Sequence, residues 1–195
     1  PLDRHHVRVI SQLCSIHFHS CPSRSSSRTL LNSVTHKDPK SVVRLVHHYN
    51  HAESLLTTDK NGSTPLHIAA MNNDKEMMRT LLTYNTIDVN KLERSSSGGY
   101  AALHHACRGG FVDIVEMLIQ ARANLDIKTA NALGETPLIV CCKINELSCA
   151  KLLINAGCNP NTVDGFGHNA TFWAISKQNN DMVSALGLPE RHTCT

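Results

Sequence analysis

The heptapeptide Thr64-Pro65-Leu66-His67-Ile68-Ala69-Ala70 decides the fold of this 195-residue chain, because related heptapeptides follow it at nearly constant intervals. The copies are Ala101-Ala102-Leu103-His104-His105-Ala106-Cys107, Thr136-Pro137-Leu138-Ile139-Val140-Cys141-Cys142 and, more weakly, Asn169-Ala170-Thr171-Phe172-Trp173-Ala174-Ile175. The starting positions are separated by 37, 35 and 33 residues. A period of this size is typical of repeat architectures, in which each unit is one supersecondary element stacked on the next.

The first residues of the heptapeptide predict the start of a helix. Thr64 and Thr136 suit the N-cap position, where a hydroxyl accepts a hydrogen bond from an early helical N–H. The following prolines then fall at the first helical position, where a missing N–H costs nothing. Ala69 and Ala70 leave a narrow face, so we expect the helix of the next repeat to approach closely.

A second amphipathic helix is predicted after each heptapeptide, because apolar residues recur there at i and i+3 or i+4. The first two copies are Met77-Met78-x-x-Leu81-Leu82 and Ile114-Val115-x-x-Leu118-Ile119. In the third copy, around Cys149-Ala150 and Leu152-Leu153-Ile154, we expect an offset of about one residue, and Met182-Val183-x-x-Leu186 is the fourth. A glycine stands two residues before each heptapeptide, where a tight turn needs a residue free of steric limits. These glycines are Gly62, Gly99, Gly134 and Gly167.

The repeated heptapeptides resemble the repeat unit of the ankyrin family, which carries the motif T-P-L-H-x-A at a 33-residue period. The ending Gly157-Cys158-Asn159-Pro160-Asn161 is similar to the family's G-A-D-x-N ending. The resemblance covers residues 59–188 well and residues 29–58 weakly, which gives four recognisable repeats and a degenerate N-terminal one. It implies an all-α solenoid of stacked helix-turn-helix units with short hairpin loops. It also implies that His67 and His104 tie neighbouring hairpins together by hydrogen bonds.

Departures from the repeat pattern predict where the surface is unusual. The insertion Ser95-Ser96-Ser97-Gly98 would lengthen one hairpin loop, and such insertions often lie on the binding face. The last repeat loses most of the heptapeptide and looks like a C-terminal cap. Its Phe172 and Trp173 make that cap apolar, so we expect one of them to be exposed at the end of the stack or covered by further chain.

Three segments are predicted along the chain. Residues 1–28 are rich in Arg and Ser with Asp3 as their one acidic residue, which indicates a disordered basic arm or, alternatively, a mitochondrial transit peptide. Residues 29–188 form the repeat domain, and residues 189–195 form a C-terminal tail. Because the chain begins with Pro1 and not Met, we expect it to be processed or a fragment.

The charge distribution argues against nucleic-acid and membrane partners. Residues 61–195 carry eleven Lys and Arg against twelve Asp and Glu, and the excess positive charge lies in residues 1–60. A neutral repeat body gives no electrostatic attraction to nucleic acid, and no apolar run approaches the ~18 residues that span a bilayer. We expect a monomeric protein of the cytoplasm, with the nucleus as an alternative location.

Neither a metal site nor a catalytic site is predicted, and no cofactor is expected. The thirteen histidines and eight cysteines lack the close pair spacing of zinc sites, and no sequence motif places a base beside a nucleophile. We interpret the cysteines as free thiols of a reducing compartment, because most stand at apolar helical positions. The cysteines are Cys14, Cys21, Cys107, Cys141, Cys142, Cys149, Cys158 and Cys194.

Asn90 and Asn161 end their repeats, each eight positions after a leucine. In the resembled family, asparagines at this place look like substrates of an asparaginyl hydroxylase, so hydroxylation of both is one hypothesis. The simpler interpretation is that each side chain hydrogen-bonds its own turn.

The resemblance implies that a partner protein binds the concave face made by hairpin fingers and inner helices. Arg, Met and aromatic side chains are common interface anchors, and the predicted face has few carboxylates, so we expect a mildly acidic, partly apolar partner segment. The candidate residues are Lys60, Asn61, Met71, Asn72, Arg94, Arg108, Leu133, Lys143, Phe166 and Lys177. The resulting hypothesis is a non-catalytic adaptor or scaffold; its rivals are a recognition module of a larger signalling or ubiquitin-ligase protein, and a metal- or redox-active thiol protein.

Overall fold

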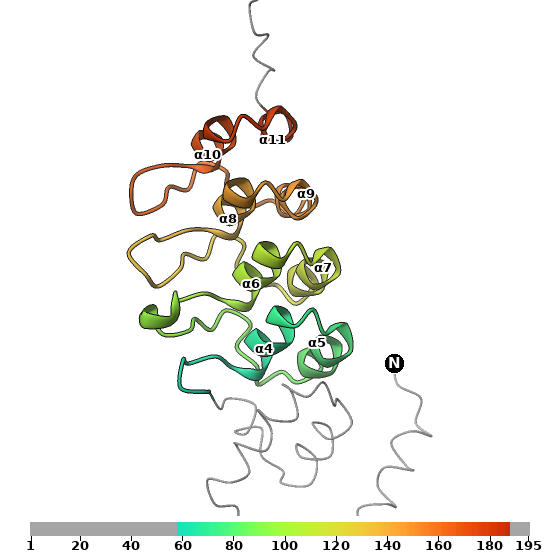
Figure 1. Ribbon diagram of the computed structural model, residues 1–195. Coiled ribbons are helices and arrows are strands. Elements are labelled where there is room, and N and C mark those ends of the chain that lie inside the picture. Colours follow the sequence, from blue (N-terminus) through green and yellow to red (C-terminus); the bar gives the residue numbers. More distant parts are fainter. Residues whose placement is uncertain (1–57, 188–195) are drawn as a thin grey trace, which may run out of the picture.

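The computed structural model describes residues 58–187, and within this range the chain forms four stacked helix pairs (Figure 1). The inner helices are α4 (Pro65–Met71), α6 (Ala102–Gly109), α8 (Pro137–Ile144) and α10 (Ala170–Ser176). The outer helices are α5 (Lys75–Leu82), α7 (Val112–Gln120), α9 (Leu147–Asn155) and α11 (Asn180–Ala185). A short 3-10 helix, η2 (Ser95–Ser97), lies in one loop, and this part of the chain contains no strand. The predicted all-α repeat solenoid is confirmed.

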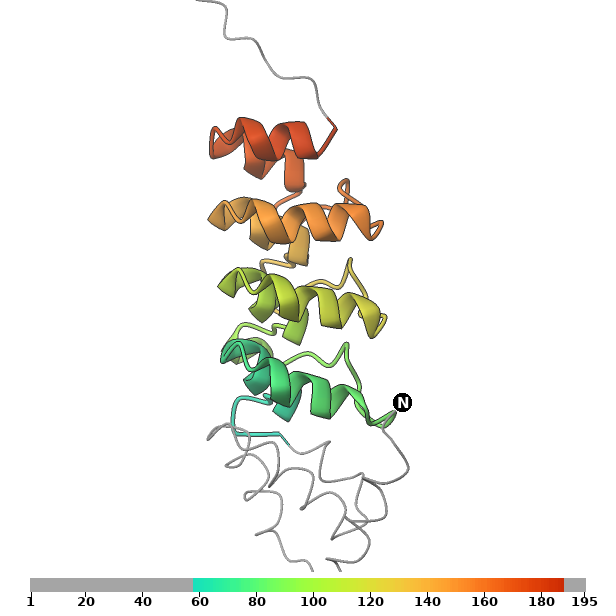
Figure 2. The same cartoon turned by 90° about the vertical axis from the view of Figure 1, so that its right-hand side faces the viewer.

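Successive repeats lie directly on one another. Each inner helix packs against the next inner helix and each outer helix against the next outer helix, as the two views show (Figures 1 and 2). The loops that precede the inner helices project to one side as fingers (Figure 1). Backbone hydrogen bonds join neighbouring fingers, from the N–H groups of Arg94, Ala130 and Gly165 to carbonyls of the finger before. The fingers therefore form a continuous layer beside the helices.

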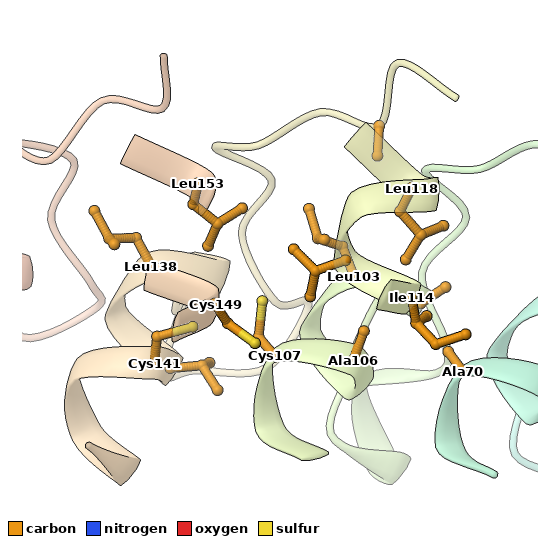
Figure 3. Packing of buried hydrophobic residues seen from close by; sticks show 14 of the residues in the cluster. Ala70, Leu103, Ala106, Cys107, Ile114, Leu118, Leu138, Cys141, Cys149 and Leu153 are labelled. Carbon is orange, nitrogen blue, oxygen red and sulfur yellow. The ribbon is translucent and has the colours of Figure 1, made fainter. Parts of the chain in front are cut away.

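The core is a column of aliphatic side chains separated by small residues at the seams between repeats (Figure 3). Ala70, Ala106 and Cys107 are fully buried at the seam positions, where a larger side chain would push neighbouring helices apart. In α9 the buried residues are Cys149, Ala150 and Leu153. They match Met77, Met78 and Leu81 of α5 position for position, so the expected one-residue offset was wrong.

The helix starts follow the predicted turn chemistry, with one exception. Thr136 accepts a hydrogen bond from the backbone N–H of Ile139, as predicted. At Thr64 the hydroxyl lies 2.8 Å from Nδ1 of His67 instead, because the histidine ring reaches back to the cap. Gly99 has φ +65°, and a Cβ there would lie 2.6 Å from the backbone nitrogen of Ala130. Left-handed backbone and close approach of the next finger both require glycine at this point.

The two signature histidines connect neighbouring repeats. Nδ1 of His104 accepts the backbone N–H of Ala101 at 3.1 Å, and Nε2 lies 3.0 Å from the carbonyl oxygen of Glu135 in the next finger. His67 repeats the arrangement with Thr64 and the Tyr100 carbonyl. The expected role of these histidines, to join neighbouring hairpins by hydrogen bonds, is therefore confirmed. The predictions made for residues 1–28, for residues 29–57 and for residues 189–195 lie outside the described residues.

Candidate protein-binding surface

The surface that the sequence predicts for a partner is formed by the fingers and by the C-terminal ends of the inner helices. The helix ends face the bases of the fingers, since Lys143 at the end of α8 bonds Glu135 in its own finger at 2.5 Å. We call this corner the finger-side surface. The ten predicted binding residues lie either in the fingers, as do Lys60, Asn61, Arg94, Leu133 and Phe166, or at the helix ends, as do Met71, Asn72, Arg108, Lys143 and Lys177.

These ten residues differ in how open they are to a partner. Seven are exposed, and three, Asn72, Leu133 and Lys143, are half-buried. Ser63 and Glu135, which also lie in the fingers, are buried at 2% and 4% exposure and form no part of the open surface. Whether these residues bind a partner stays a prediction.

Arg108 and Lys143 occupy the same repeat position but have different surroundings. The Arg108 guanidinium lies 5.7 Å from the centre of the Tyr100 ring, with its side chain exposed. Lys143 is paired with buried Glu135 and also lies 4.3 Å from the centre of the Trp173 ring in the next repeat. Because its charge is already compensated, Lys143 is a weaker candidate for a partner contact than Arg108. The sequence analysis did not select Tyr100. Tyr100 stands directly before its heptapeptide, in the same repeat position as Glu135 before the next heptapeptide.

Three acidic residues of the fingers are turned away from solvent, and a fourth, Asp59, is half-buried. Glu93, Glu135 and Asp164 are 6%, 4% and 5% exposed. Glu93 lies between Ser63, whose hydroxyl donates to it at 2.5 Å, and Nε2 of His105 at 3.1 Å. Burial acts to raise the pKa of Glu93, but the hydrogen bonds from His105 and Ser63 prevail and lower it. The carboxylate is therefore charged and held by hydrogen bonds inside the finger layer, and the exposed cations dominate the finger-side surface.

The last repeat carries a group of aromatic rings. His168 stacks on Phe172 at 3.8 Å with an angle of 5° between the ring planes, and Phe172 meets Trp173 edge to face. Phe166 and Phe172 are 65% and 45% exposed, while Trp173 donates its indole N–H to Asp164 at 2.9 Å. Of the two residues that the sequence considered for the open end of the stack, Phe172 is thus the exposed one.

Asn90 has a structural role in the turn between repeats. Its side-chain oxygen accepts the backbone N–H of Asn124, one repeat further on, at 2.7 Å. In the next turn, the carboxylate of Asp126 likewise accepts the backbone N–H of Asn159, at 2.8 Å. Asn90 and Asn161 are both exposed at the surface, and the hydroxylation of either one stays a prediction.

The five described cysteines, Cys107, Cys141, Cys142, Cys149 and Cys158, are buried free thiols. Burial raises the pKa of Cys142 and of Cys149 to about 12, so little thiolate is present for nucleophilic or redox chemistry. Between residues 58 and 187 no group of three or more His, Cys, Asp or Glu side chains is placed to hold a metal ion. In the same range, no helix is long and apolar enough to cross a bilayer.

Stacked helix pairs, bridging histidines and a layer of joined fingers define the chain as a helical repeat protein. The family model for ankyrin repeats, in three copies, matches residues 30–129 and 123–192. The chain belongs to the ankyrin-repeat family, which consists in general of non-catalytic modules that bind other proteins.

Three relatives illustrate where similar repeats occur. Neurogenic locus notch homolog protein 1 of Xenopus tropicalis is 32% identical over 130 residues, 66% of this chain and 5% of that protein. Target of rapamycin complex 2 subunit AVO2 of Saccharomyces cerevisiae is 32% identical over 103 residues, 53% of this chain and 23% of that protein. E3 ubiquitin-protein ligase KEG of Arabidopsis thaliana is 26% identical over 132 residues, 68% of this chain and 8% of that protein. The chain thus spans a small part of each of these relatives.

Proposed function

We propose that this protein is a non-catalytic adaptor that binds an acidic, partly apolar segment of another protein on its finger-side surface. The observation that carries the proposal is the separation of charge there. Lys60, Arg94, Arg108 and Lys177 are exposed, whereas the finger carboxylates Glu93, Glu135 and Asp164 are buried and Asp59 is half-buried. A surface with this imbalance attracts negatively charged segments and disfavours basic ones.

Apolar contacts complete the proposed site. Met71, Ile144 and Ile175 lie at or near the C-terminal ends of inner helices and are 41%, 45% and 40% exposed, and Phe166 projects from the last finger. Large exposed side chains of this kind supply the buried centre of an interface, and a rim of cations gives it orientation. The expected ligand therefore alternates Asp or Glu with aliphatic residues.

The test is selection of binding peptides from a random dodecapeptide display pool on the immobilised full chain. We expect enrichment of sequences with Asp or Glu between aliphatic residues. Arg108→Ala should weaken binding of the selected peptides roughly 5- to 30-fold, the loss typical of one interface anchor. Its melting temperature should stay nearly unchanged, since an exposed cation–π pair contributes little stability.

A matched control comes from the outer layer. Lys151 in α9 is also an exposed cation, and Lys151→Ala should leave peptide binding unchanged. Selected peptides without acidic residues, or equal binding losses for Arg108→Ala and Lys151→Ala, would contradict the proposed surface.

A second proposal is that the same surface acts as the recognition module of a larger signalling or ubiquitin-ligase protein. It is favoured by two of the relatives, a subunit of target of rapamycin complex 2 and an E3 ubiquitin-protein ligase, of which the chain spans small parts. We place the protein in the cytoplasm in either case, because buried free thiols at the repeat seams suit a reducing compartment.

A further inference from the structure

The finger that precedes α6 differs from the other three fingers. It is closed at its base by a hydrogen bond from the N–H of Glu93 to the carbonyl of Tyr100, and its tip contains η2. The fingers of the first and last described repeats close between Asp59 and Ser63 and between Asp164 and His168, and the finger before α8 closes between Thr129 and Glu135, one residue shorter than the finger before α6. The added segment therefore lies beyond the part of the finger that supports the stack.

The tip displays serine hydroxyls beside a cation. Ser96 is exposed and Ser97 half-buried, and Arg94, three positions before Ser97, is exposed. The Arg94 guanidinium donates to the carbonyl of Lys60 at 3.0 Å, which holds it at the surface. The one acidic residue of this finger, Glu93, is turned inward to Ser63 and His105. A protein kinase would thus meet an arginine followed by serines without a competing carboxylate.

The tip is held by its own hydrogen bonds, apart from those that close the base. Within residues 95–99, the backbone N–H groups of Ser97 and Gly99 both donate to the carbonyl of Arg94. The base is held separately, by the Glu93–Tyr100 bond and by the bond from Ala130 to the carbonyl of Gly99. Because the bonds that close the base do not involve Ser97, local opening of the tip leaves them in place, and Ser97 can then adopt the extended conformation that kinases bind while the repeats remain folded.

We propose that Ser97 is a phosphorylation site for an arginine-directed serine kinase, and that the phosphate weakens binding of an acidic partner to the finger-side surface. The Ser97 hydroxyl oxygen attacks the γ-phosphorus of ATP, a new O–P bond forms, the bond to ADP breaks and the hydroxyl proton is released. The second half of the proposal rests on the function proposed above, whereas the modification itself does not.

The expected effect follows from the cations around the tip. Gly98, next to Ser97, lies against the Tyr100 ring, since a Cβ on Gly98 would be 2.4 Å from a ring carbon. Arg108 lies over the same ring. A phosphate on Ser97 adds a charge of about −1.5 to −2 close to Arg94 and Arg108. It competes with acidic partner residues for these cations and repels the partner.

The modification is tested by incubating the full chain with ATP and an arginine-directed kinase, such as a calmodulin-dependent protein kinase, and locating the phosphate by fragment mass spectrometry. We expect phosphate on Ser97 in the wild type, and its loss in Ser97→Ala and in Arg94→Gln. Ser96→Ala is the matched control and should keep it. A free peptide of residues 90–101 shows whether the kinase accepts the sequence outside the fold. Absence of phosphate on Ser97 overturns the proposal, whether the free peptide is modified or not.

The consequence is measured with the acidic dodecapeptides selected on the unmodified protein. We expect the phosphorylated protein to bind them at least tenfold more weakly, with its melting temperature unchanged. Equal binding before and after modification would overturn the regulatory half. If no acidic peptides are selected at all, the proposed binding function fails, while the location of the phosphate still decides the modification.

Discussion

At the scale of single residues, the chain uses buried histidines in their neutral form. His104 is fully buried, accepts a backbone N–H at Nδ1 and donates from Nε2 to the carbonyl of Glu135. Burial lowers its pKa from 6.5 to about 4, and burial also lowers the pKa of His67. A hydrogen-bonding pattern that needs one protonated and one unprotonated ring nitrogen is lost when the imidazole gains a second proton.

The lowered pKa of His104 makes the free energy of unfolding depend on pH. The unfolded chain binds a proton at His104 near pH 6.5, and the folded chain binds it only near pH 4. The free energy of unfolding should therefore be highest above pH 6.5 and fall as the pH drops towards 4, by about 3 kcal/mol for this histidine alone. Urea unfolding at several pH values measures this dependence. His104→Gln should flatten it, and an unchanged slope in that variant would show that other groups cause the fall.

At the scale of single helices, small residues decide how closely the repeats approach. Ala106 of α6 is fully buried where α6 packs between α4 and α8. The cysteines Cys107, Cys141 and Cys142 take similar places, because a thiol behaves as a small apolar side chain there. Periodicity in the sequence identified these positions, since each keeps its distance from the start of the heptapeptide.

A larger side chain at such a seam should separate the helices. Ala106→Leu is expected to lower the free energy of unfolding by about 1–3 kcal/mol, through strain in the packed interface. Thermal or urea denaturation followed by circular dichroism measures the change. Ala156 at the C-terminal end of α9 is exposed, so Ala156→Leu serves as the control and should stay near wild-type stability. Similar losses in both variants would mean that seam packing is not the cause.

At the scale of the whole molecule, the position of a repeat in the stack decides what a residue contributes. Ile139 of α8 and Phe172 of α10 occupy the same place in their heptapeptides. Ile139 is fully buried between neighbouring repeats, whereas Phe172 is 45% exposed. Stability in such arrays is close to a sum of repeat terms and nearest-neighbour interface terms.

Truncation of these two residues should therefore have unequal effects. Ile139→Ala leaves a cavity between two repeats and should cost about 2–5 kcal/mol of unfolding free energy. Phe172→Ala should cost less than half as much, because much of its ring already contacts water. Equilibrium urea denaturation of both variants in the full chain gives the comparison. A larger loss for Phe172→Ala would indicate that its face is covered in the folded protein.

The sequence alone determined the architecture of this protein, because local chemistry repeats along it. Helix caps, prolines and small seam residues recur in register, and each repeat needs only its neighbours to bury its core. The family was identified from the same repeated heptapeptides. One local error, the offset assigned to α9, came from aligning Leu152 in place of Leu153, which the burial of Leu153 corrected.

Only the tertiary structure decided which polar residues are open on the finger-side surface. Ser63 and Glu93 are 30 positions apart in the chain and meet only when two repeats stack. Lys143 reaches the Trp173 ring of the next repeat for the same reason. Sequence patterns place residues on a face, but whether a charge there is free or neutralised depends on contacts between repeats. That is why Arg108 and Lys143 look equivalent in the sequence and differ in the folded protein.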